Sequence, residues 1–184
     1  SSTRVVNVDR DQFGDRFFSG FESSSYSYYA DEALSKKLIE NEISKLESLF
    51  LETKYLVLGT ISLSTPISAE TIFFLLEQAR KFQVKVIIDL NWREVFWNNA
   101  SFSAAVSKPA RVKLIKNFLN HAHILKLAKE EATLFFEQEN PFLISQQLLK
   151  KPDVIITDGK NPVSWYCNGF KGKTGIPDSQ KKNC

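Results

Sequence analysis

The sequence contains no methionine and only two cysteines, Cys167 and Cys184, in 184 residues. Two cysteines cannot form the disulfide framework of a small secreted protein, so we expect a reducing compartment. No secretory signal peptide is visible either. The predicted location is therefore intracellular, in the cytoplasm or in an organelle such as a plastid, and not outside the cell. A chain that opens with Ser1 and lacks methionine also suggests a fragment or a processed product.

The sequence also lacks a strong net charge and long apolar runs. Its net charge of +3 is too small to indicate nucleic acid as a partner. No apolar run approaches the roughly 18 residues that a membrane-spanning helix requires, so no membrane partner is expected. The chain does contain 43% hydrophobic residues, with 15 phenylalanines among them. This composition is typical of a soluble globular protein with a substantial core.

Short apolar runs rich in β-branched residues alternate with patterns of helical period along most of the chain. We expect the first helical pattern to begin at a cap formed by Asp31 and to break near Asn41. The alternation predicts an α/β fold with a doubly wound parallel sheet, right-handed crossovers and strands buried on both faces. The predicted strands are 55–58, 84–89, 123–127 and 153–157, and the predicted helices are 31–50, 66–79, 109–119, 129–138 and 142–150.

Two hairpins complete the predicted fold. Residues 3–8 and 16–21 predict two strands joined at a turn that contains Gly14 and Asp15. We expect this small antiparallel hairpin to act as a lid, so the predicted division is a lid-like hairpin and loop at 1–29 and a partial α/β domain at 30–184. Near the other end, Asn168-Gly169 predicts the turn of a second hairpin.

Polar residues follow the predicted strands at the place where ligands bind in open α/β sheets, outside the carboxyl ends. Asp89, Asn91 and Arg93 combine a carboxylate, an amide and a guanidinium, which together suit a polar, phosphorylated ligand. In the alternative interpretation, Asp89 caps a turn and Arg93 pairs with Glu94 in solvent. Three other strand ends carry polar or glycine-bearing sequences, namely Gly59-Thr60, Lys126 to Glu131 and Thr157 to Gly159.

Two other patterns are weak as functional signals. His121 and His123 lie two residues apart before a predicted strand, without a cysteine or a further histidine nearby. We expect capping or packing roles for them rather than a metal site. Gly172-Lys173-Thr174 is similar to the end of a phosphate-binding P-loop, but Cys167 occupies the position of its first glycine.

Four segments of the chain resemble motifs of one enzyme family. Residues 89–93, DLNWR, with Trp97 four residues on, are similar to a D-x-N-x-R…W segment. Residues 126–132 resemble K-x-N-x-x-E, residues 157–159 resemble T-x-G, and residues 14–21, GDRFFSGF, resemble lid strands. Taken together and in this order, the segments cover most of the chain. The chain therefore resembles the pfkB (ribokinase-like) carbohydrate kinases, and in particular their fructokinase-like branch.

The resemblance implies an ATP-dependent transfer of the γ-phosphoryl group to a sugar hydroxyl, with Mg²⁺ as a cofactor. Carried over by position, Asn91 and Arg93 would face the sugar and the transferred phosphate. Thr157 and Gly159 would line the nucleotide, and Glu131 would help to order Mg²⁺ through water. Read from the residues alone, Glu131 could equally be a solvated helix residue, and Thr157 to Gly159 could form an ordinary turn. Lid strands with an exposed edge often pair with a second copy, so a homodimer is among the expected partners.

The chain also departs from the family pattern. Ala128 stands where K-x-N-x-x-E has Asn, and Pro162 stands where the family usually has the second Gly of T-x-G-x-x-G. The family's first strand and its D-T-x-G-A-G-D segment, which supplies the catalytic Asp, have no counterpart in these 184 residues. We therefore expect no catalytic residue here, and the chain resembles a fragment of a sugar kinase that is inactive alone. The alternative is a non-catalytic, kinase-like binding or regulatory module.

Overall fold

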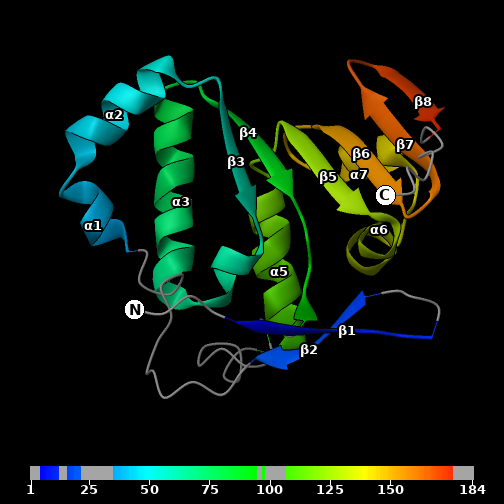
Figure 1. Cartoon of the computed structure of the whole chain (residues 1–184). Coiled ribbons are helices and arrows are strands. Elements are labelled where there is room, and N and C mark those ends of the chain that lie inside the picture. The colour runs from blue at the N-terminus through cyan, green and yellow to red at the C-terminus, as the bar shows by residue number, and fades with distance from the viewer. Residues whose placement is uncertain (1–4, 13–15, 22–34, 95–96, 98–106, 176–184) are drawn as a thin grey trace, which may run out of the picture.

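The computed structural model describes residues 5–12, 16–21, 35–94, 97 and 107–175. It contains a six-stranded sheet in the order β3-β4-β5-β6-β7-β8 and a separate two-stranded hairpin, β1-β2 (Figure 1). Strands β3 to β6 are parallel, and β7 and β8 continue the sheet in antiparallel fashion. The strands are β1 Val6–Arg10, β2 Arg16–Phe21, β3 Tyr55–Gly59, β4 Lys85–Asp89, β5 Ile124–Ala128, β6 Asp153–Asp158, β7 Asn161–Cys167 and β8 Phe170–Thr174.

Four of the described helices begin where the sequence supplies a side-chain cap or a proline. Thr65 caps α3 by accepting a hydrogen bond from the backbone N–H of Ser68, and Pro66 occupies the first helical position. The predicted break near Asn41 is confirmed, because it separates α1 from α2, whereas the predicted cap Asp31 lies outside the described residues. The helical segments are α1 Lys36–Glu40, α2 Ile43–Glu52, the 3-10 turn η2 Ile61–Ser64, α3 Pro66–Lys81, α5 Lys108–Leu119, α6 Lys129–Phe136 and α7 Pro141–Gln147. These elements confirm the predicted α/β fold with a parallel core and a small antiparallel hairpin.

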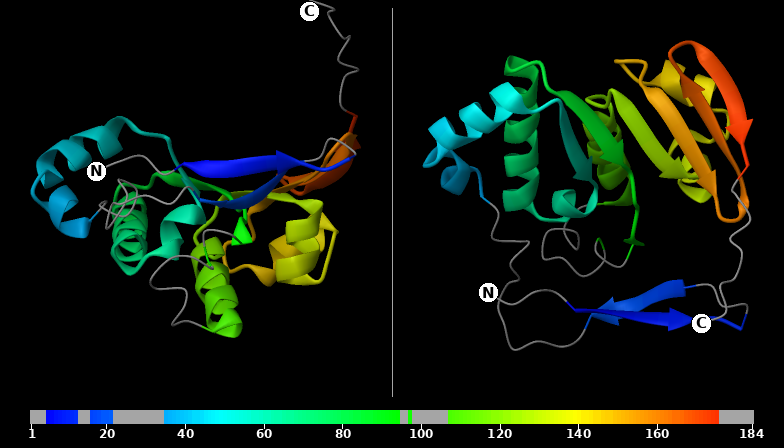
Figure 2. Two further views of the ribbon diagram at one scale, coloured as in Figure 1. Left: turned by 60° about the horizontal axis from the view of Figure 1, so that its bottom comes forward. Right: turned by 45° about the horizontal axis from the view of Figure 1, so that its top comes forward.

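The core lies on one face of the sheet. Helices α3, α5 and α6 lie on the same side of it in Figure 2, as expected when parallel strands follow one another in chain order through crossovers of one hand. The opposite face is more open, since the side chain of Val57 in β3 is 65% exposed. The prediction that the strands are buried on both faces is therefore wrong for the described chain. The side chains that the strands bury beneath the helices are Val86, Ile88, Leu125, Leu127, Val154 and Ile156.

The open face of the sheet and the position of β3 at the edge of the described strands predict self-association of the 184-residue chain. An exposed apolar edge strand pairs readily with another strand, and a lysine on such an edge prevents the pairing. We expect Val57→Lys to shift the chain from associated species toward monomer, and Leu149→Lys, at a position 82% exposed and beyond α7, to leave association unchanged. Size-exclusion chromatography with light scattering measures both. A monodisperse wild-type monomer with a single sharp melting transition would contradict this prediction.

One further property follows from the helices themselves. Within the described ranges, no helix combines the length and the apolar character that crossing a bilayer requires.

Candidate functional site

The carboxyl ends of β4 and β5 bring two opposite charges together. Asp89 and Lys126 are cross-strand partners in register. The Nζ of Lys126 lies 3.0 Å from Oδ1 and 3.3 Å from Oδ2 of Asp89, with both side chains partly exposed. Asp89 is thus paired across the sheet instead of capping a turn. The sequence reasoning did not single out Lys126 as a site residue, although its place in the K-x-N-x-x-E segment at a neighbouring strand end was a usable signal.

The turn after β4 is fixed by hydrogen bonds to β5, to the residue that follows β3 and to one helix. The backbone N–H of Leu90 donates to the carbonyl of Lys126 at 2.9 Å, and the buried hydroxyl of Thr60 donates to the carbonyl of Leu90 at 2.6 Å. One residue later, the backbone N–H of Trp92 donates to Oε1 of Glu131. Asn91, between these anchors, adopts a left-handed conformation with φ of +41°. Anchors on both sides of Asn91 hold this turn in one orientation.

Arg93 lies between this turn and the hairpin. Its Nη1 donates to the carbonyl of Trp92 at 2.9 Å, and the carbon of its guanidinium group lies 5.0 Å from the centroid of the Phe18 ring in β2. Figure 1 shows the hairpin lying beyond the carboxyl ends of β3 and β4. A guanidinium group has five N–H donors, so most of its donor capacity is left for a ligand. The predicted lid therefore touches the predicted phosphate-binding residue.

Glu131 is a buried connector rather than a solvated helix residue. It is 6% exposed, and its two carboxylate oxygens accept the backbone N–H groups of Trp92 and Ala128, the latter at 2.7 Å. Burial raises the pKa of Glu131, and the two amides together with Lys126 and Arg93 oppose that rise. The interpretation of Glu131 as solvated is therefore wrong, and the residue joins the first turn of α6 to the turn after β4. The described residues contain no cluster of three potential metal ligands.

Thr157 and Gly159 lie at the next strand end along the sheet. Thr157 pairs in register with Ala128, and its hydroxyl lies 3.5 Å from the carbonyl of Leu127. Gly159 has a φ of +50°, and a Cβ atom added there would meet no other atom within 4 Å, so the backbone conformation rather than crowding favours glycine. Three consecutive strand ends, β4, β5 and β6, thus carry all the residues that the sequence proposed for phosphate, metal and nucleotide.

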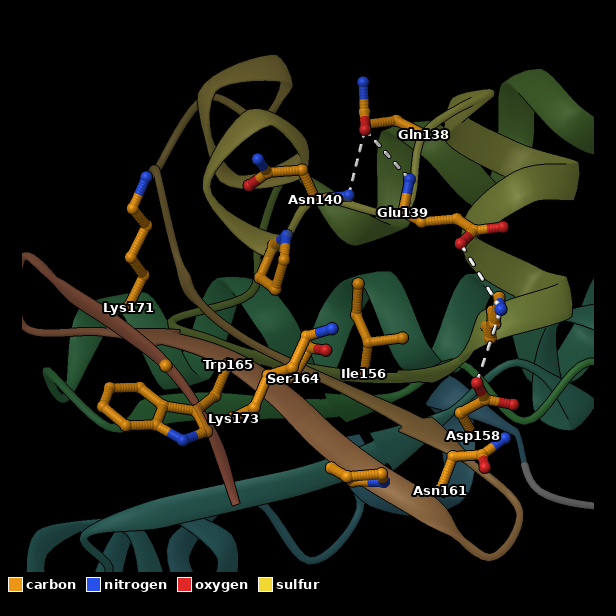
Figure 3. A pocket seen from close by; sticks show the side chains of 14 residues that line it. Gln138, Glu139, Asn140, Ile156, Asp158, Asn161, Ser164, Trp165, Lys171 and Lys173 are labelled. Carbon is orange, nitrogen blue, oxygen red and sulfur yellow. Dashed lines mark hydrogen bonds and ion pairs between the residues drawn. The ribbon is translucent and has the colours of Figure 1, made fainter. Parts of the chain in front are cut away.

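Asp158 follows Thr157 as the last residue of β6. It forms an ion pair with Lys129 at 3.4 Å, and Lys129 also lies 3.6 Å from a carboxylate oxygen of Glu139. Figure 3 shows this chain of charges along one wall of a cavity of about 570 Å³ between the α6–α7 connection and the β7–β8 hairpin. Asp158 is therefore paired with Lys129.

A second cavity, of about 300 Å³, lies at the carboxyl end of β3. Asn91 contributes to its wall, together with four serine and threonine residues. The sequence reasoning missed this cavity, and the signal was the density of hydroxyl side chains in residues 60–68, TISLSTPIS. The other lining residues are Gly59, Ile61, Ser62, Ser64, Thr65 and Ser68.

Solved structures share this fold at low sequence identity. Fructokinase from Xylella fastidiosa with bound ATP matches with a TM-score of 0.70 and 22% identity, over 95% of this chain and 49% of that chain. The PfkB protein from Polaromonas sp. JS666 matches with a TM-score of 0.72 and 13% identity, over 95% and 54%. A ribokinase II from E. coli in complex with ATP and Mg²⁺ matches with a TM-score of 0.65 and 16% identity, over 88% and 47%.

These matches confirm the predicted ribokinase-like fold, and the chain spans about half the length of each of the three proteins. No curated protein matches the sequence. The model of the pfkB family of carbohydrate kinases matches residues 22–183. This range includes all strands of the six-stranded sheet and all of the described helices. The chain therefore belongs to the pfkB carbohydrate kinase family.

Proposed function

We propose that this chain carries the sugar-facing and phosphate-facing part of an ATP-dependent sugar kinase. Such an enzyme transfers the γ-phosphoryl group of ATP to a sugar hydroxyl. The observation that carries the proposal is the convergence of Asp89, Lys126, Arg93 and Thr157 at adjoining strand ends of a pfkB-family sheet. Family membership supports the reaction type, and structural relatives bound to ATP, or to ATP and Mg²⁺, support the nucleotide and the cofactor.

The cavity at the end of β3 is suited to a sugar. A sugar presents several hydroxyl groups, and each needs a hydrogen-bonding partner when it leaves water. Asn91 supplies two donors and an acceptor in the wall of this cavity, and four serine and threonine residues lie with Gly59 and Ile61 in the rest of the wall. Fructose is our proposed substrate, because the motif-like segments of the sequence resemble the fructokinase-like branch.

Arg93 and Lys126 supply positive charge for the phosphates. Phosphoryl transfer depends mainly on positioning and on neutralising charge, and Arg93 offers a planar fork that matches phosphoryl oxygens. Thr157 and Gly159 would line the nucleotide at the adjoining strand end. Glu131 fits a water-mediated contact with Mg²⁺ better than direct ligation, because each carboxylate oxygen already accepts a backbone N–H. When bound, Mg²⁺ neutralises phosphate charge.

The β1–β2 hairpin is the proposed lid. In the proposed division of the chain, residues 1–29 form the lid-like hairpin and loop, and residues 30–184 form the partial α/β domain. Phe18 supports this role, because it already contacts the guanidinium group of Arg93. Closure over the site would exclude water from the transfer. Val8 in β1 and Val5 just before it are about half exposed, at 48% and 49%. This exposed apolar surface supports the proposal that the lid strands of two copies pair to form a homodimer.

Calorimetric titration with a panel of simple sugars tests the proposal. We expect saturable binding of fructose to the 184-residue protein in the presence of Mg²⁺ and a non-hydrolysable ATP analogue, with affinity between about 1 μM and 1 mM, the usual range for enzyme substrates. Sorbitol, which lacks the ring, is the matched control. Binding without sugar-dependent ADP release is the result expected of a kinase fragment that is inactive alone, and the absence of sugar binding with or without nucleotide would contradict the proposed function.

A further inference from the structure

Ser64 is the last residue of the 3-10 turn η2, which connects β3 to α3. The turn is anchored at its start, where the hydroxyl of Thr60 donates to the carbonyl of Leu90 and the carbonyl of Thr60 accepts the N–H of Leu63 at 3.0 Å. Leu63 is completely buried in the core. The residue after Ser64 is Thr65, the cap of α3. Ser64 therefore has a fixed position beside the carboxyl end of β3.

The hydroxyl of Ser64 is buried but has no partner in the protein. Ser64 is 4% exposed, and no hydrogen bond joins its side chain to any residue that the structure describes. Among those residues, the unpartnered side-chain atoms that are sealed from solvent belong to Gln78, Trp97 and Ser145, so the oxygen of Ser64 is not sealed. Because Ser64 lies in the wall of the 300 Å³ cavity, this oxygen is accessible from the cavity.

The other hydroxyl groups in the described wall of this cavity are already engaged. The hydroxyl of Ser62 donates to the carbonyl of Gly59 at 3.2 Å, and Oγ1 of Thr65 accepts the backbone N–H of Ser68 at 3.4 Å. Ser68 also has a partner of its own. Within this part of the wall, Ser64 is thus the residue whose hydroxyl hydrogen and lone pairs are all unused. A buried hydroxyl in this state favours a ligand that can pair with it.

On the basis of the proposed function, we propose that Ser64 is a specificity-determining residue of the sugar site and that its hydroxyl binds one hydroxyl group of the sugar. A sugar hydroxyl is both a donor and an acceptor, and so is the hydroxyl of Ser64. Asn91 contributes to the same wall from the turn after β4, so the sugar is held between two neighbouring strand ends. The site discriminates against a sugar that lacks this hydroxyl group, because Ser64 then stays buried without a partner.

Calorimetric titration of the 184-residue protein with fructose and its monodeoxy analogues tests the proposal, with Mg²⁺ and a non-hydrolysable ATP analogue present. We expect Ser64→Ala to weaken fructose binding about 3–10-fold, the usual loss for one neutral hydrogen bond. One deoxy analogue, which lacks the partner hydroxyl, is expected to bind the wild type and Ser64→Ala equally. The other analogues are expected to bind Ser64→Ala more weakly than the wild type.

Ser145→Ala is the matched control. Ser145 is also a buried serine without a hydrogen-bond partner, but it lies in α7 and not in the wall of the cavity. Its substitution is expected to leave the affinity for fructose and for every analogue unchanged. Neither substitution removes a hydrogen bond within the protein, so neither is expected to lower the melting temperature.

The outcomes separate this inference from the proposed function on which it rests. Unchanged fructose affinity in Ser64→Ala, or an equal loss for fructose and all its deoxy analogues, would overturn the role of Ser64 while leaving the sugar site in place. A lower melting temperature in Ser64→Ala but not in Ser145→Ala would show that Ser64 is structural, and would overturn it as well. A wild-type protein that binds no sugar would overturn both.

Discussion

In the sugar kinase of which this chain is proposed to form a part, replacing Arg93 by alanine is expected to lower sugar-dependent ADP release by about 10²–10³-fold, the usual cost of removing one preorganised group that stabilises charge in the transition state. The physical reason is that Arg93 offers unused guanidinium donors at the strand end where Asp89 and Lys126 also lie. Arg93→Lys keeps the charge and loses the fork, so we expect an intermediate loss. A coupled ADP-release assay with fructose, corrected for a control without sugar, measures the effect.

The melting temperature of the Arg93 variants is the necessary companion measurement. The side chain of Arg93 is partly exposed and donates to its own neighbour's carbonyl, so its removal should change stability little. Arg80→Ala is the matched control, because Arg80 is an exposed arginine in the last turn of α3, away from the carboxyl ends of the strands. This substitution should change neither the melting temperature nor the ADP release. Parallel losses of melting temperature and activity in Arg93→Ala would mark the residue as structural.

Replacing Glu131 by alanine is expected to lower the free energy of unfolding by about 2–4 kcal/mol, because it removes two hydrogen bonds to a buried carboxylate and leaves two N–H groups unpaired. The two N–H groups belong to Trp92 and Ala128. Glu131→Gln is expected to cost less, since its amide oxygen can still accept one of them while its NH₂ group opposes the other. Urea denaturation monitored by tryptophan fluorescence measures these differences.

Glu130→Ala is the matched control for Glu131→Ala. Glu130 is the preceding residue in the same first turn of α6 and lies closer to solvent. Its removal should change the unfolding free energy by no more than about 0.5 kcal/mol, as for most surface substitutions. A Glu131→Ala protein as stable as wild type would show that the buried carboxylate does not hold the turn after β4.

The polar residues at the strand ends could be predicted because the strand and the residues that follow it lie in one short stretch of sequence. The run Val86-Ile87-Ile88 predicts a strand, and the polar residues directly after it must lie at its carboxyl end. The pairing of Asp89 with Lys126 depends on the register between β4 and β5, which no pattern within either strand specifies. The sequence could therefore place both residues at one edge of the sheet, but not in contact.

Two other features could not be predicted because they depend on packing between distant elements. Glu131 has the sequence context of a solvated helix residue, and only the approach of the turn at Trp92 buries it. The apolar composition of β3 is that of a strand buried on both faces, yet Val57 is exposed because the described helices cover the opposite face. Composition indicates how much a strand can bury, and the arrangement of helices decides how much it does bury.

The central claim is that a sugar and ATP bind at the carboxyl ends of β3 to β6. Hydrogen exchange of the backbone amides, measured with and without fructose and a Mg²⁺-bound ATP analogue, tests it most directly. We predict slower exchange on ligand addition in residues 59–65, 89–93, 126–131 and 157–159, with no change in α1 and α2. Protection confined to other segments, or none in these four, would contradict the account.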